Sequence, residues 1–188
     1  MPSRDQHNRR SIRLRDYDYS SPGEYFITIC TQNRECLFGD VVDGEMESNE
    51  IGQIAERFWQ RIPERYENII LDAFVVMPNH IHGIIGIEYD MESEFVGAIH
   101  ELPLQHEKPE EYRKSRRQMY LSKIIGWYKM NVAKKSNVIL DNTGNKFWQR
   151  NYYEHIIRNE KSLNRIRDYI LNNPALWEED QNHPDYME

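Results

Sequence analysis

Two histidines, His80 and His82, are the residues of this chain whose types and spacing first suggest chemistry. They stand at the start of an apolar run, continued by Ile84 and Ile85, that is typical of a β-strand. Side chains two residues apart on a strand point to the same face of the sheet, so both imidazoles can bind one metal ion. A hydrogen-bonded surface histidine is the simpler alternative for either residue, and the pair alone does not exclude it.

The residues around this pair narrow the chemistry. A nucleotide hydrolase of the His-x-His-x-His type needs a third histidine at position 84, which is Ile84, so that function is excluded. Gly83 lies on the opposite face of the run, among Ile81, Ile85 and Ile87, and has no side chain, which suits close approach of another group to the backbone.

A second candidate group lies far downstream, where Tyr169 and Asn173 are one helical turn apart. Tyr169 lies beside the apolar stripe of its helix, not in its middle. A phenol can attack phosphorus, and an amide oxygen can reach the same metal ion or phosphate. Taken separately, Tyr169 could be a packed aromatic and Asn173 a helix end before Pro174. Together with the histidine pair, they favour metal-assisted attack on a phosphodiester.

The hydrophobic pattern predicts the elements that position these groups. Strands are expected over 25–31, 69–77, 80–87 and, last, within 146–157, with a short hairpin over 41–46 that turns at Asp-Gly. Helices are expected from an Asn49 cap to Ile62, over 121–132, and from an Asn159 cap to Asn173. This order predicts an α+β fold: a ferredoxin-like antiparallel sheet flanked by helices, with a C-terminal helix that carries the tyrosine.

The whole chain, 1–188, is expected to form a single domain, with a basic N-terminal arm over 1–20 and a long charged loop over 88–117. Roughly eighteen consecutive apolar residues, the minimum for a membrane helix, do not occur. The N-terminal segment also lacks the apolar region of a secretory signal. Cys30 and Cys36 are expected to be reduced thiols without a function.

The formal net charge of −7 argues against an indiscriminate nucleic-acid binder. The positive charge is nevertheless concentrated near the N-terminus and over 107–135, and this favours binding of one defined nucleic acid. Solvated helix faces and a basic tail are the alternative, which charge alone leaves open. The candidate DNA-binding residues are Arg9, Arg10, Arg13, Arg113, Lys114, Arg116, Arg117, Lys123 and Arg150.

Motifs in distant segments, in this order, resemble a known family. They are Tyr25-Phe26-Ile27-Thr28, Met77-Pro78-Asn79-His80-Ile81-His82-Gly83, Phe147-Trp148-Gln149-Arg150-Asn151-Tyr152-Tyr153-Glu154-His155 and Tyr169-Ile170-Leu171-Asn172-Asn173-Pro174. The chain resembles the transposases of the insertion-sequence-200 type and, more closely, the REP-associated tyrosine transposases, over most of its length. The resemblance implies that His80 and His82 hold a divalent ion, that Tyr169 is the nucleophile, and that Asn173 completes the metal site. The loop over 88–117 has no match in the family pattern.

The resemblance further implies cleavage and rejoining of single-stranded or hairpin DNA from palindromic repeats, through a 5′-phosphotyrosine intermediate. Its cofactor would be Mg²⁺ or Mn²⁺, although imidazole and amide ligands alone suit manganese, nickel or zinc at least as well. The protein would act in the bacterial cytoplasm, associated with the nucleoid and not with a membrane, as a monomer or a homodimer.

Several alternatives remain. Tyr152 and Tyr153 are rival nucleophiles, ranked below Tyr169 because neither has an amide one helical turn on. They could instead stack exposed bases together with Trp127, Tyr128 and Trp148, although core packing is the simpler fate of most of these rings. The chain could also be a domesticated, non-cleaving hairpin-binding protein, or a metal-dependent phosphodiester hydrolase that leaves a free 5′-phosphate.

Overall fold

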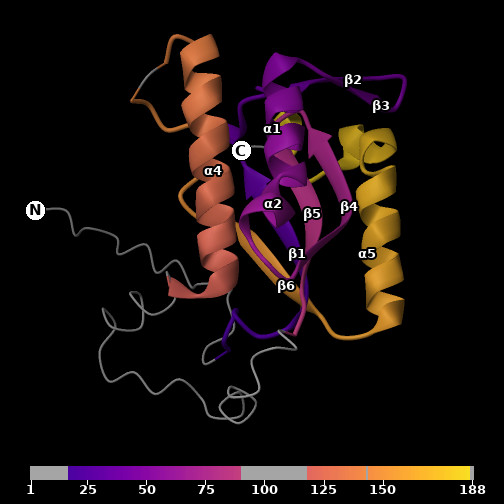
Figure 1. The fold of residues 1–188 in the computed structure, drawn as a ribbon. Coiled ribbons are helices and arrows are strands. Elements are labelled where there is room, and N and C mark those ends of the chain that lie inside the picture. Colours follow the sequence, from indigo (N-terminus) through magenta and orange to yellow (C-terminus); the bar gives the residue numbers. More distant parts are fainter. Residues whose placement is uncertain (1–16, 90–117, 143, 187–188) are drawn as a thin grey trace, which may run out of the picture.

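The computed structural model describes residues 17–89, 118–142 and 144–186. Its centre is an antiparallel sheet with the strand order β4-β5-β1-β6 (Figure 1). The strands are β1 (Gly23–Cys30), β4 (Ile69–Met77), β5 (His80–Ile87) and β6 (Tyr153–Ile157). One helical crossover joins β1 to β4 and another joins β5 to β6, so each crossover skips one strand. This is the ferredoxin-like arrangement that the sequence predicted.

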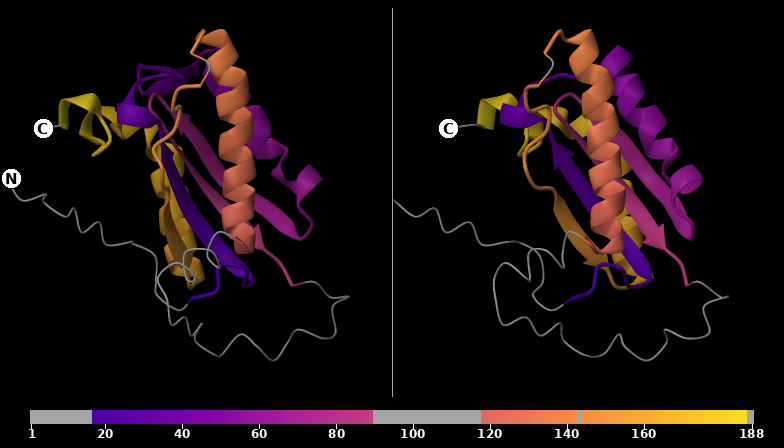
Figure 2. Two further views of the ribbon diagram at one scale, coloured as in Figure 1. Left: turned by 90° about the vertical axis from the view of Figure 1, so that its left-hand side faces the viewer. Right: turned by 60° about the vertical axis from the view of Figure 1, so that its left-hand side comes forward.

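Helices cover both faces of the sheet. The helices α1 (Glu50–Gln60) and α4 (Tyr120–Ile139) lie on one face, and α5 (Glu160–Asn172) lies on the other (Figure 2). The side chain of Asn49 accepts hydrogen bonds from the backbone N–H groups of Ile51 and Gly52, so α1 begins at the predicted cap. A short helix, α2 (Ile62–Arg65), follows α1. None of the helices in the described segments is long and apolar enough to cross a membrane.

The face under α1 and α4 holds the larger core. Trp59 of α1 is almost fully buried and stacks on Phe74, with its ring edge against Tyr128 of α4. A Cβ atom on Gly83 would lie 2.3 Å from Cζ2 of Trp59. The close approach expected at Gly83 therefore comes from the protein's own tryptophan, not from a ligand.

The predicted hairpin is also present, as β2 (Gly39–Val42) and β3 (Glu45–Ser48). Its two turn residues, Asp43 and Gly44, have φ angles of 51° and 79°. Two consecutive residues in this left-handed region form the turn whose twist matches a two-stranded ribbon. The Asp-Gly pair therefore fixes the hairpin locally.

The prediction of a strand within 146–157 is correct only for its second half, because β6 begins at Tyr153. Phe147 and Trp148 instead turn into the core against Phe38, and only an isolated bridge joins Trp148 to Thr31. The Trp148 indole N–H donates to the Lys129 carbonyl at 3.0 Å. Packing of the two large rings outweighs their strand propensity, because that propensity depends on context.

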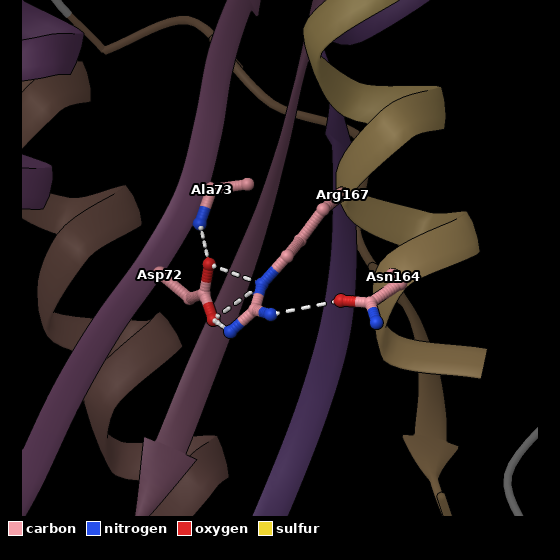
Figure 3. Close-up of polar contacts among 4 residues, drawn as sticks. All are labelled: Asp72, Ala73, Asn164 and Arg167. Atoms are coloured by element: carbon pink, nitrogen blue, oxygen red, sulfur yellow. Dashed lines mark hydrogen bonds and ion pairs between the residues drawn. The ribbon is translucent and has the colours of Figure 1, made fainter. Parts of the chain in front are cut away.

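Helix α5 is held to its own sheet by an ion pair as well as by apolar contacts. The Arg167 Nε–H donates to both carboxylate oxygens of Asp72 at 3.0 Å, and the Ala73 N–H donates to the same carboxylate (Figure 3). Asp72 lies at an irregularity in the pairing of β4 with β5. The ion pair therefore links α5 to the strand at the edge of the sheet.

Two predicted segments lie mostly outside the described residues. Of the basic arm, only 17–20 is described, and Tyr19 in it is buried in the core. Of the charged loop, only 88–89 is described at its N-terminal end. Cys30 and Cys36 are free thiols.

Candidate metal and nucleophile site

Strand β5 places His80 and His82 on the sheet face that carries α5. In the neighbouring strand β1, Cys30 lies opposite His80 and Thr28 lies opposite His82. The two histidines are 0% and 2% exposed. The two Nε2 atoms are 3.0 Å apart. Charged imidazoles would repel each other at this distance, so the arrangement requires neutral rings or a shared ligand.

The Nδ1 atom of each histidine has a hydrogen-bond partner. His80 Nδ1 lies 2.8 Å from Oδ1 of Asn79, which can only accept, so Nδ1 carries the proton and Nε2 is left with a lone pair. His82 Nδ1 lies 2.8 Å from the Thr28 hydroxyl, which can accept in the same way. Two ligand atoms each about 2.1 Å from one ion, at right angles, are about 3.0 Å apart. The pair therefore has the geometry of two cis ligands.

Burial, with a smaller contribution from the positive charge of Arg34, lowers the pKa of His80 to about 3, while the amide of Asn173 opposes the shift. Burial also holds the pKa of His82 well below its usual value, with a smaller contribution from His80. Both imidazoles are thus neutral near pH 7. A metal ligand must be in this state.

A carboxylate that sequence reasoning missed completes the cluster. After α5, the segment η2 (Pro174–Glu179) turns back over the site, and Trp177 lies against His80 with ring centroids 6.0 Å apart. Asp180, the residue that follows η2, is 7% exposed. One oxygen of its carboxylate and one nitrogen of each histidine lie within 4.8 Å of one another. A tryptophan in an otherwise acidic tail was the one sequence signal that this segment packs.

Asn173 lies beside this cluster and is 1% exposed. Its Nδ2 donates to Oδ2 of Asp180 at 3.2 Å, whereas its buried Oδ1 has no hydrogen-bond partner among the described residues. A buried carbonyl oxygen without a partner costs about 1–3 kcal/mol. A cation beside His80 and His82 would offset this cost, so the donor set fits a divalent ion.

The Tyr169 hydroxyl lies 3.2 Å from Nε2 of His82. Tyr169 is on α5, one turn before Asn173, with its ring edge against Phe26 at a centroid distance of 6.0 Å. Burial, with a smaller contribution from the nearby charge of Asp180, raises the pKa of Tyr169 to about 12, while the Asn173 amide opposes the shift. The phenol therefore keeps its proton at neutral pH unless a positive charge or a base is supplied.

The rival tyrosines lie elsewhere. Tyr153 pairs across the sheet with Thr28 and is 37% exposed, on the same face as the histidines. The Tyr152 hydroxyl lies 3.4 Å from that of Ser122, on α4 at the opposite face. Of the five aromatics considered for base stacking, Tyr128 and Trp148 are buried and cannot stack bases. Trp127 and Tyr152 pack against the core, so only Tyr153 keeps an open ring.

Two of the predicted DNA-binding cations, Lys123 and Arg150, are within the described residues, and neither belongs to this cluster. Lys123 is exposed on α4, which covers the face of the sheet opposite the histidines, and Arg150 is exposed before β6. The other predicted cations lie outside the described residues: Arg9, Arg10, Arg13, Arg113, Lys114, Arg116 and Arg117.

No family model matches the chain. An uncharacterized protein of Haemophilus influenzae Rd is 44% identical over 182 residues, which cover 95% of each chain. A REP-associated tyrosine transposase bound to a REP hairpin is 17% identical, with a TM-score of 0.49 over 88% of this chain and 73% of that one. A putative transposase of Deinococcus radiodurans is 18% identical, with a TM-score of 0.37 over 86% and 97% of the two chains. By its identity over almost the full length of both proteins, this chain belongs to the same family as the H. influenzae protein.

Proposed function

We propose that this chain is a divalent-metal-dependent DNA strand transferase of the REP-associated tyrosine transposase type. The observation that carries the proposal is the position of the Tyr169 hydroxyl, 3.2 Å from Nε2 of His82, with His80 facing the same point. The candidate nucleophile and one of the two candidate metal ligands, 87 residues apart in the sequence, are thus in contact. The motif resemblance supports hairpin DNA with single-stranded flanks as the substrate, and the bacterial cytoplasm as the place of action.

In this proposal, His80, His82, Asp180 and Oδ1 of Asn173 hold the cation, and Mg²⁺ or Mn²⁺ would polarise a non-bridging oxygen of the scissile phosphate. Asn79 and Thr28 keep the two Nε2 atoms directed at the ion. Helix α5 holds the Tyr169 hydroxyl at the edge of the same cluster. The sheet, the helix and the returning tail therefore each supply part of one site.

The reaction is a transesterification. The Tyr169 oxygen forms a bond to phosphorus while the bond from phosphorus to the 3′ oxygen breaks. The phenolic proton passes to water, and the leaving 3′ oxygen takes a proton from water. The product is a 5′-phosphotyrosine and a free 3′-hydroxyl. The number of phosphodiester bonds is unchanged, so a second 3′-hydroxyl can reverse the step and join new ends without ATP.

One observation favours a second candidate. A phenol whose pKa is raised to about 12 is a poor nucleophile at neutral pH, so water at the same cation could attack instead. The chain would then be a phosphodiester hydrolase, and the downstream fragment would carry a free 5′-phosphate.

A single assay separates these functions. Hairpin DNA labelled at the 3′ end is incubated with the protein and Mn²⁺ or Mg²⁺, or with a chelator, and resolved on a denaturing gel. We expect a labelled protein–DNA adduct with metal and none with chelator or with His82→Ala, whereas Tyr153→Phe keeps the adduct. Cleavage to a free 5′-phosphate without adduct would replace the proposal by the hydrolase. Binding without any cleavage would replace it by a non-cleaving hairpin-binding protein.

A further inference from the structure

A hollow of about 450 Å³ opens at the edge strand β6, where the chain turns into α5. The side chains that give it polar character come from both elements and the turn between them: His155, Arg158, Asn159, Ser162 and Arg165. Tyr153 forms its aromatic wall. The hollow is separate from the cluster of His80, His82 and Asp180.

Two residues that line the hollow, Tyr153 and His155, lie on the same face of the sheet as the candidate site. His82, Thr28 and Tyr153 lie in one row across β5, β1 and β6, and Phe26 lies opposite His155 in the next row. The Phe26 ring is 5.3 Å from the ring of His82, 6.0 Å from that of Tyr169 and 6.2 Å from that of Tyr153. Contacts between aromatic rings therefore link Tyr169, through Phe26, to Tyr153 at the hollow.

The charge of the hollow favours an anion. Arg158 and Arg165 are exposed, and neither forms an ion pair with any residue in the described segments. The N-terminus of α5, with its partial positive charge, adds to the same field. Glu154 is the acidic residue among the lining side chains, but strand alternation directs it to the opposite face and it is 5% exposed.

We propose that this hollow binds a backbone phosphate of the single-stranded DNA that flanks the scissile bond, with Arg158 and Arg165 as phosphate ligands and Tyr153 as a stacking surface for one base. The inference rests on the proposed function and adds the path that the substrate strand follows from Tyr169. Open aromatic rings bind the faces of unpaired bases, which a duplex keeps stacked inside, so the occupant is a single strand.

Binding is tested in the Tyr169→Phe protein, so that cleavage does not interfere. Anisotropy is measured with a labelled hairpin that carries a single-stranded flank and with the same hairpin without it. Replacing both Arg158→Gln and Arg165→Gln should weaken binding of the flanked hairpin about tenfold and leave the blunt hairpin unchanged. Each phosphate contact on a single strand contributes roughly 0.7 to the slope of log K against log salt, so loss of this one contact should lower the slope by about 0.7.

The matched control is Arg57→Gln with Arg61→Gln, which removes the same charge from exposed positions of α1 and its C-cap on the other face. It should leave both affinity and slope unchanged, and Arg158→Lys with Arg165→Lys should restore most of the slope. Neutral methylphosphonates placed one at a time along the flank should identify the contacted phosphate. At that position the parent protein loses affinity and the Gln variant does not.

The outcomes separate this inference from the proposed function. Equal affinity and slope in the Gln variant and its parent, or equal losses in the α1 control, would overturn the inference even if wild type forms the adduct at Tyr169. Flank binding that depends on Arg158 and Arg165, with no adduct in wild type, would support the phosphate site and overturn the strand transferase. Failure of the parent to discriminate flanked from blunt hairpin would overturn the inference directly.

Discussion

The two faces of the sheet are built for different purposes, and β5 shows the difference residue by residue. Its residues Ile81, Gly83 and Ile85 face α1 and α4 in a large apolar core that Trp59 closes. Its residues His80 and His82, on the other face, are equally buried but polar. Within the described part of the chain, a smaller apolar cluster supports that face: Phe26, Ile84, Ile157, Leu163, Ile166 and Ile170.

This comparison shows how one strand can combine stability with a polar site. The face under α1 and α4 supplies most of the apolar burial, so the other face can keep buried imidazoles and a buried carboxylate. It can also keep the Asn173 amide oxygen, which has no hydrogen-bond partner among the residues that the structure describes. The cost of those polar groups is offset by hydrogen bonds to Asn79 and Thr28 and, in our proposal, by a cation. Changes on the two faces should therefore have different effects.

The largest effect is expected on the core face. Trp59→Ala removes a fully buried ring that stacks on Phe74, and such substitutions cost about 3–5 kcal/mol of the free energy of unfolding. Urea unfolding measures the loss. A cost below about 1 kcal/mol would mean that α1 contributes little to the stability of the sheet, and the comparison between the faces would fail.

A smaller, ligand-dependent effect is expected from the histidine pair. Mn²⁺ at one hundred times its dissociation constant should stabilise the wild type by about 2.7 kcal/mol, because only the folded state assembles the site. His82→Ala should remove this stabilisation and the calorimetric binding signal, whereas His155→Ala, an exposed histidine on the same face, should retain both. Equal Mn²⁺ affinity in wild type and His82→Ala would contradict the metal site.

The buried histidines also predict how stability depends on pH without metal. Their pKa values are lower in the folded state, so as pH falls below about 6.5 the unfolded chain takes up protons that the folded chain does not. Stability should fall by up to about 1.4 kcal/mol per pH unit for each histidine, down toward pH 3, where His80 itself is protonated. Urea midpoints between pH 7 and 4 test this, and His82→Gln should show a shallower slope. A slope that does not change would mean that His82 does not stay neutral in the fold.

The smallest effect on stability is expected at the ion pair between Asp72 and Arg167, because both side chains reach solvent. Asp72→Asn should slightly lower stability at pH 7 but slow adduct formation severalfold, since α5 carries Tyr169. Arg167 lowers the pKa of Asp72 through its hydrogen bond, so the stabilisation is present above the usual aspartate pKa and is lost as pH falls through the folded value. The urea midpoints of wild type and Asp72→Asn should therefore converge at acidic pH. An Asn164→Ala control removes the neighbouring contact to Arg167 and should leave the adduct rate nearly unchanged.

Much of the fold could be predicted because short stretches of sequence determine its strands and helices. Alternation and β-branched residues predicted β4 and β5 with their observed bounds, and asparagine caps predicted the starts of α1 and α5. The segment of Phe147 and Trp148 was wrongly predicted as strand because its rings find a tertiary partner in Phe38 that no local pattern reveals.

The candidate site was less accessible to sequence reasoning. Spacing brought His80 and His82 together, and helical periodicity placed Asn173 one turn after Tyr169. Asp180 could not be anticipated, because it reaches the histidines only when the chain turns back after Pro174 and Trp177 packs on His80. The contact of Tyr169 with His82 likewise depends on how α5 packs on the sheet, which sequence spacing does not determine.

The central claim is that Tyr169 is the residue that becomes joined to DNA, and peptide mapping of the adduct tests it most directly. Adducts formed with Mn²⁺ are digested with protease and nuclease, and the nucleotide-bearing peptide is identified by mass spectrometry. We predict a single modified peptide with the nucleotide on Tyr169. Tyr169→Phe, which keeps the ring against Phe26, should fold and bind metal and hairpin DNA as wild type does, yet give no adduct. A nucleotide on Tyr153 or Tyr152, or an adduct that persists in Tyr169→Phe, would contradict the claim.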